Sequence, residues 1–187
     1  MSDDIDSFIQ KFQEEMLKQA RETYGEIFFK RWQQPLYIGV LEDADAASLL
    51  KGSCGDTIEI FLKFKNGFVE KALFQTDGCA PSIVCGSFAA ELSIGKTPEE
   101  LLDISAETII DKIGKLPQEV QHCAFLAAAT VHSAVDKYMI KQIHKDKGTA
   151  IEEDKKALNQ KHGSVQGVSR KSETILNDRN VAEGVQN

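Results

Sequence analysis

A β-hairpin is the feature that most constrains what this chain can fold into. Two runs of β-type sequence, 57–65 and 68–76, flank the dipeptide Asn66-Gly67. Asn-Gly between two such runs is a strong hairpin signal, because both residues tolerate the positive φ of a type I′ turn. In the first run, apolar residues recur at every second position and share one strand face: Ile58, Ile60, Leu62 and Phe64. The sequence therefore predicts an antiparallel pair of strands with one buried face.

The two-residue turn fixes which residues of the two strands face each other. Lys63 is expected opposite Glu70, a favourable cross-strand charge pair, and Ile60 is expected opposite Leu73. The same register places Lys71 on the apolar face, an awkward position for a charged side chain. Separately, β-bulges can make the register slip at the strand ends.

Extended past both strands, this register brings cysteines and carboxylates together. Asp56 comes opposite Asp77, and Cys54 comes opposite Cys79. Directly opposed residues have Cβ atoms roughly 5 Å apart, close enough for their side chains to share one metal ion or cluster. Thiolates and carboxylates bind zinc and iron, and thiolates are the ligands that iron–sulfur clusters require.

A third cysteine, Cys123, follows His122 near the start of a predicted long helix. Unpaired N–H groups and the helix macrodipole favour a thiolate in that position, which suits a ligand or a nucleophile. His122 alone equally suits a hydrogen-bonded helix histidine. Asp56 alone equally suits an ordinary turn residue ahead of a strand.

Two facing cysteines are also compatible with a disulfide or with plain buried thiols. The chain starts without an apolar signal segment, and four cysteines in 187 residues do not make a disulfide scaffold. We therefore expect metal ligation in a cytoplasmic protein. No apolar run reaches the roughly 18 residues of a membrane span. The formal net charge of −7 argues against general binding to nucleic acid or to anionic membranes.

The N-terminal segment, 1–35, is expected to form one amphipathic helix over residues 4–32, ended by Pro35. Its apolar residues recur at steps of three and four: Ile5, Phe8, Ile9, Phe12, Met16, Leu17, Ala20, Tyr24, Ile27 and Phe28. We interpret this stripe as packing on the rest of the domain. A homodimer or partner contact is the alternative.

The main domain is expected over residues 36–146, followed by a mostly disordered tail, 147–187, with a transient helix near 151–158. A third strand is expected at 36–42, beside the hairpin. Helices are expected at 82–94, from the capped start Thr97-Pro98, at 105–113 with Ser105 as its cap, and from Pro117 to about residue 143.

Taken in order, three cysteine segments form a specific combination: Cys54-Gly-Asp56, Asp77-Gly78-Cys79, and Leu116-Pro117 ahead of His122-Cys123. They resemble the ligand segments of the iron–sulfur cluster assembly scaffold family, which comprises IscU-like proteins and the N-terminal domain of NifU. The resemblance spans Tyr24 to Tyr138 and includes three further stretches: Tyr24-Gly-Glu, Trp32-Gln-Gln-Pro35 with Gly39, and Gly95-Lys96-Thr97.

This resemblance implies an α+β fold, in which a small antiparallel sheet of about three strands carries helices on one face and ligands at one end. It implies a scaffold that builds a transient [2Fe–2S] cluster from iron and persulfide sulfur and transfers it to apo-proteins. Cys54, Cys79 and Cys123 are the implied ligands, with Asp56 or His122 completing the set. Cys123 is the implied acceptor of sulfur from a cysteine desulfurase. Fe²⁺ or Zn²⁺ alone is an alternative occupant.

Two functions are compatible with this ligand set. The first is the cluster scaffold, a carrier and not an enzyme. The second is a zinc-holding protein in which Cys123 relays persulfide and no cluster forms. A Cys–His enzyme with Cys123 as nucleophile would leave Cys54, Asp56 and Cys79 without a purpose.

The sequence also departs from the family pattern. The segment Leu116–Val120 lacks the second proline and the lysine common in bacterial members, which argues against recognition by the dedicated Hsp70-type chaperone. Cys85 lies six residues after Cys79 and off its helix face, so we expect a buried thiol and not a ligand. The interval from Cys79 to Cys123 is too short for the extra segment of the zinc-dependent SufU branch.

Overall fold

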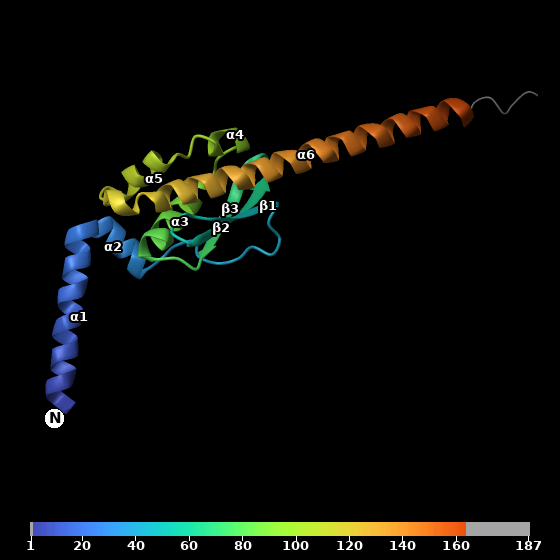
Figure 1. The fold of residues 1–187 in the computed structure, drawn as a ribbon. Helices are drawn as coiled ribbons and strands as arrows, with labels where there is room; N and C mark the ends of the chain where they lie inside the picture. Colours follow the sequence, from blue (N-terminus) through green and yellow to red (C-terminus); the bar gives the residue numbers. More distant parts are fainter. Residues whose placement is uncertain (1, 164–187) are drawn as a thin grey trace, which may run out of the picture. The chain divides into compact units, whose positions relative to one another are not determined.

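A computed structural model describes residues 2–163 of the chain. Figure 1 labels its α-helices and strands. The elements run in this order: α1 (Ser2–Tyr24), α2 (Glu26–Gln33), β1 (Ala46–Lys51), β2 (Thr57–Lys65), β3 (Phe68–Thr76), α3 (Ala80–Ser93), α4 (Pro98–Leu101), α5 (Ala106–Ile113), a 3-10 turn (Gln118–Val120) and α6 (His122–Gly163). One small antiparallel sheet with helices makes this an α+β fold, as predicted. No helix within residues 2–163 is long and apolar enough to cross a membrane.

The sheet has three strands in the order β1-β2-β3, and both neighbouring pairs are antiparallel. The prediction of a third strand at 36–42 was wrong, because that segment forms only one parallel bridge, Ile38 to Phe74. Gly39 interrupts it with a φ of 146°. The third strand is β1, whose sequence of alanine, serine, leucine and lysine has little intrinsic strand preference.

The predicted hairpin turn is confirmed. Asn66 and Gly67 both have positive φ, 55° and 84°. The register then shifts by one residue at a bulge between Lys63 and Phe64, after which Lys63 pairs with Lys71. The predicted pairs Lys63–Glu70 and Ile60–Leu73 are therefore wrong. The shift leaves Lys71 exposed and places Ala72 in the core, so the sheet avoids burying a lysine.

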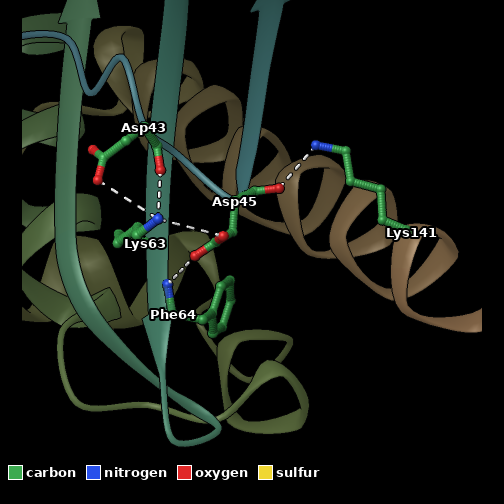
Figure 2. A network of polar contacts seen from close by, with 5 residues as sticks. All are labelled: Asp43, Asp45, Lys63, Phe64 and Lys141. Carbon is green, nitrogen blue, oxygen red and sulfur yellow. Dashed lines mark hydrogen bonds and ion pairs between the residues drawn. The ribbon is translucent and has the colours of Figure 1, made fainter. Parts of the chain in front are cut away.

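A polar network fixes this bulge and ties α6 to the sheet (Figure 2). Asp45 accepts a hydrogen bond from the backbone N of Phe64 at 2.8 Å, and its carboxylate pairs with Lys63 at 3.6 Å. Lys63 also donates to the carbonyl of Asp43 at 2.8 Å. From α6, Lys141 donates to the carbonyl of Asp45 at 2.9 Å. These contacts hold the start of β1, the bulge and α6 together.

The N-terminal segment is two helices and not the single predicted one. Gly25, with a φ of 83°, separates α1 from α2. The prediction that the α1 stripe packs on the domain was also wrong, since its apolar side chains before Leu17 are 46–70% exposed: Ile5, Phe8, Ile9, Phe12 and Met16. In α2, by contrast, Phe28 and Phe29 are buried.

Helices α3, α4 and α5 begin close to their predicted starts, whereas α6 begins at His122 and not at Pro117, because a 3-10 turn precedes it. Thr97 and Glu100 form a capping box at α4, and Ser105 caps α5. On α3, a Cβ at Gly86 would lie 2.5 Å from the Phe74 ring, so glycine lets α3 approach β3 closely. Sheet and helices share one core that includes Ile60, Leu62, Phe74, Val84, Ile109 and Val131.

Helix α6 extends beyond its predicted end near residue 143. It runs to Gly163, so residues 147–163, expected to be mostly disordered with only a transient helix near 151–158, are helical. Residues 164–187 of the predicted tail lie outside the described residues. By contacts, the chain divides into one compact unit that ends at His144 and a second that begins at Lys145.

Candidate metal centre

Three segments that are distant in sequence meet at one end of the sheet. Asp56 directly precedes β2, Cys79 directly precedes α3, and Cys123 lies in the first turn of α6. A carboxylate oxygen of Asp56 and the Sγ atoms of Cys79 and Cys123 all lie within 4.8 Å of one another. We call these three residues the donor trio. One carboxylate and two thiols at this spacing are suited to hold zinc or iron.

The bulge in the hairpin decides which residues meet at the trio. Asp77 accepts hydrogen bonds from the backbone N and the hydroxyl of Thr57, at 2.7 and 2.8 Å. Asp56 consequently lies against Gly78, where a Cβ would be only 2.5 Å from Asp56 Oδ2. The facing pairs Asp56–Asp77 and Cys54–Cys79 were predicted from a register without a bulge. The bulge shifts that register by one residue, so the residues of each pair are no longer directly opposite.

Two hydrogen bonds converge on Oδ2 of the Asp56 carboxylate. The Ser82 hydroxyl donates at 2.7 Å, and the backbone N of Cys79, at the start of α3, donates at 3.1 Å. These bonds, the one from Ser82 foremost, lower the pKa of Asp56 below its ordinary value. The trio therefore contains a carboxylate that is ionised at neutral pH.

Cys123 is completely buried, and burial raises the pKa of its thiol to about 12. The Ser82 hydroxyl donates a hydrogen bond to Cys123 Sγ at 3.4 Å, which acts in the opposite direction. The sequence analysis expected the helix start to favour the thiolate, but desolvation outweighs that effect here. Without a metal ion Cys123 carries its proton, and metal binding must displace it.

Cys54 lies beside the trio without being part of it. Its exposed thiol is a minor hydrogen-bond contributor to the lowered pKa of Asp56, and its charge contributes to the raised pKa of Cys123. A tight turn sets this position, because Gly52 N donates to the carbonyl of Asp56 at 2.8 Å and Gly55 adopts a φ of 95°. The first cysteine is thus at the solvent edge of the site.

The two other sequence candidates lie outside the trio. His122 Nδ1 is 2.9 Å from the carbonyl oxygen of Glu119, a local contact at the start of α6. Cys85 is completely buried, as expected, and burial raises its pKa. All four cysteines are free thiols, so the alternative of a disulfide is excluded in this structure.

The sequence analysis did not single out Ser82, although its side chain contacts the whole trio. Its Oγ lies 2.7 Å from Asp56 Oδ2, 3.4 Å from Cys123 Sγ and 3.7 Å from Cys79 Sγ. The available signal was its spacing, because residues three apart share a helix face and Ser82 follows Cys79 by three.

Comparison with known proteins identifies the family of the chain. The sequence profile described as "NifU-like N terminal domain" matches residues 23–145, which is more than half of the chain. The chain belongs to the NifU-like N-terminal domain family. The resemblance seen in the cysteine segments is therefore confirmed.

Relatives within the NifU-like family include two with scaffold names. The chain is 36% identical over 134 residues to iron-sulfur cluster assembly scaffold protein IscU 1 of Archaeoglobus fulgidus, covering 70% of this chain and 88% of that one. It is 31% identical over 122 residues to iron-sulfur cluster assembly scaffold protein IscU of Aquifex aeolicus, covering 64% and 78%.

A solved structure shares the fold. The crystal structure of a nitrogen-fixing NifU-like protein (N-terminal) from Brucella abortus superposes with a TM-score of 0.53 at 20% sequence identity. The superposition covers 65% of this chain and 98% of that structure. The NifU-like fold is therefore common to both chains.

Proposed function

We propose that this chain is a scaffold on which a [2Fe–2S] cluster is assembled and from which it is passed to recipient apo-proteins. The donor trio of Asp56, Cys79 and Cys123 is the observation that carries the proposal. Its three segments occur in the order that the resemblance to IscU-like proteins requires. The scaffold names of the relatives support the same role, in which the protein is a carrier and not an enzyme.

The cluster is cargo, so its ligands must bind it and also release it. We assign Cys54, Cys79, Cys123 and Asp56 as the ligands. Asp56 is preferred over His122 because its carboxylate lies in the trio, whereas the Nδ1 atom of His122 contacts the backbone. A carboxylate is a harder ligand than a thiolate, so three thiolates and one oxygen should hold a cluster less inertly than four thiolates.

Cys123 is the proposed acceptor of persulfide sulfur. In that step its thiolate attacks the outer sulfur of a persulfide on a cysteine desulfurase, the S–S bond breaks, and the desulfurase thiolate leaves. Because buried Cys123 keeps its proton in the metal-free protein, iron must bind first and displace that proton. Sulfur delivered before iron is expected on the exposed thiols of Cys54 and Cys79.

The partners that follow are a cysteine desulfurase and apo-proteins that receive the cluster, in the cytoplasm. Recognition by a dedicated Hsp70-type chaperone is not proposed, because the segment Leu116–Val120 lacks the second proline and the lysine. Neither nucleic acid nor membrane is a proposed partner. A homodimer formed through the exposed apolar stripe of α1 is a further proposal.

Anaerobic reconstitution with ferrous iron, cysteine and a desulfurase tests the function. We expect the visible absorption of a [2Fe–2S] cluster, lost when Cys54, Cys79 or Cys123 is changed to Ser. Cys85→Ser is the matched control and should retain it. Stoichiometric zinc bound so tightly that no cluster forms, even after chelation, would support the persulfide relay instead.

A further inference from the structure

The Ser82 hydroxyl lies at the junction of the donor trio. Ser82 is completely buried in the first turn of α3, three residues after Cys79. Its Oγ contacts Asp56 at 2.7 Å, Cys123 at 3.4 Å and Cys79 at 3.7 Å. One side chain thus touches the oxygen donor and both sulfur donors.

The chemistry of a hydroxyl decides how these contacts divide. A serine hydroxyl has one hydrogen to donate and two lone pairs that accept. The hydrogen goes to the Asp56 carboxylate, because that contact is the shortest and is assisted by charge. The same hydroxyl is also within donor distance of Cys123 Sγ, at 3.4 Å, and it contacts Cys79 Sγ at 3.7 Å, so Ser82 links the oxygen donor to the sulfur donors.

Other buried serines on α3 make a different kind of contact. Ser93 donates to the carbonyl of Ala89 at 2.7 Å, within its own helix. Ser87 donates to the carbonyl of Leu36 at 2.8 Å and so ties α3 to the segment after α2. These serines satisfy backbone groups, whereas the hydrogen bonds of Ser82 go to residues of the trio.

Ser82 also fixes which way the Asp56 carboxylate faces. The hydrogen bonds from the Ser82 hydroxyl and from the Cys79 backbone N both fall on Asp56 Oδ2 and fix the position of that oxygen. A Cβ at position 78 would come within 2.5 Å of Oδ2 and 2.8 Å of the Ser82 Cβ. The carboxylate is therefore confined between Gly78 and Ser82.

We propose that Ser82 is a positioning residue that holds Asp56, Cys79 and Cys123 together as one preformed donor set before any metal arrives. It acts through these ligands and does not need to coordinate the ion itself. This inference rests on the proposed function and deepens it by naming the residue that organises the centre. Groups that orient metal ligands in this way typically change metal affinity by about 10- to 100-fold.

Anaerobic titration with Co²⁺ alone tests the inference without cluster assembly. Dissociation constants would come from chelator competition, and the ligand set from the sulfur-to-cobalt charge-transfer bands. We expect Ser82→Ala to raise the dissociation constant about 10- to 100-fold. Ser93→Ala, a buried serine on the same helix, should bind cobalt as the wild type does. Cobalt affinity of Ser82→Ala within threefold of wild type would overturn the inference.

Two further comparisons separate positioning from folding. Ser82→Thr and Ser82→Val have nearly equal volumes and differ by the hydroxyl, so Thr should bind cobalt more tightly and equal affinities would count against the inference. In an Asp56→Ala background, Ser82→Ala should cost much less affinity than in the wild type. Independent, additive losses would contradict an action through Asp56.

The wild-type titration distinguishes failure of the inference from failure of the proposed function. A wild-type protein that shows no sulfur-to-cobalt bands, or bands unchanged by Cys79→Ser, would refute the metal centre itself. A wild-type protein that shows those bands but binds no better than Ser82→Ala would refute only the role of Ser82.

Discussion

At the scale of single residues, the cysteines of this chain differ in accessibility. Cys54 and Cys79 are exposed, whereas Cys85 and Cys123 are buried and have raised pKa values. The exposed pair can meet a partner, and the buried Cys123 needs a metal ion to become a thiolate. Whether a metal ion is bound therefore decides which of the sulfur atoms reacts.

Alkylation of the metal-free protein checks this difference. At neutral pH we expect iodoacetamide to modify Cys54 and Cys79 well before Cys123 and Cys85, because the exposed pair is accessible and burial raises the pKa of the other two thiols. Peptide mass spectrometry over a time course measures the order. Cys123 reacting as fast as Cys79 would show that its thiol is neither buried nor protonated.

The raised pKa of Cys123 also predicts a pH dependence of stability. The folded pKa lies above the ordinary value of 9.0, so the folded state holds the proton more tightly than the unfolded chain. The stabilisation is complete below pH 9 and is lost as the pH rises toward about 12. Burial of Cys85 acts in the same direction.

Thermal unfolding of the metal-free protein measures this effect. The melting temperature of the wild type should fall more steeply above pH 9 than that of Cys85→Ala/Cys123→Ala. The double variant is expected to be less stable at neutral pH because of its cavities. Equal slopes for the two proteins would mean that the buried thiols do not couple folding to protons.

At the scale of elements, the junction between β3 and α3 determines the geometry of the site. Gly78→Ala should displace the Asp56 carboxylate, since the added Cβ would lie 2.5 Å from Oδ2 and 2.8 Å from the Ser82 Cβ. We expect a loss of about 1–3 kcal/mol in the free energy of unfolding, together with weaker cobalt binding. Denaturant titration and cobalt titration measure the two effects, and unchanged cobalt affinity would contradict the confinement of Asp56.

Helix α1 gives a second prediction at this scale. Phe12→Ser should change the free energy of unfolding by no more than about 0.5 kcal/mol, because Phe12 is 58% exposed. Phe28→Ala in α2 is the contrast, since Phe28 is buried and stacks on Tyr24; it should lose about 3–5 kcal/mol. Chemical denaturation distinguishes the two, and a large loss for Phe12→Ser would mean that α1 packs on the domain after all.

Local signals explain which elements could be predicted from the sequence. The Asn66-Gly67 turn and the caps Thr97 and Ser105 act within a few residues, so pattern alone identifies them. The bulge depends on the competition between burying Lys71 and losing one ladder position. β1 forms because it pairs with β2, and its own sequence carries little signal for a strand.

The candidate site divides in the same way. Asp56, Cys79 and Cys123 were predicted because their residue types and order suit a metal centre, and the structure brings them within 4.8 Å. Ser82 was missed because a serine near a helix start has many roles, and its contacts become visible only after the segments meet. The one-residue shift in register was missed with the bulge.

At the scale of the whole molecule, the arrangement suits a protein that carries a cluster and gives it away. Donors from three segments meet at one end of the sheet, with a buried thiol beneath and exposed thiols at the rim. The NifU-like fold brings these segments together, and the turn around Cys54 lies at the solvent edge. Loading and release then need no large cavity.

Analysis of iron and acid-labile sulfide in the anaerobically reconstituted protein tests this account most directly. The account predicts iron and sulfide in equal amounts in the wild type and in Cys85→Ser, and little sulfide in Cys123→Ser. Iron or zinc bound without sulfide in the wild type, or full sulfide retained by Cys123→Ser, would contradict it.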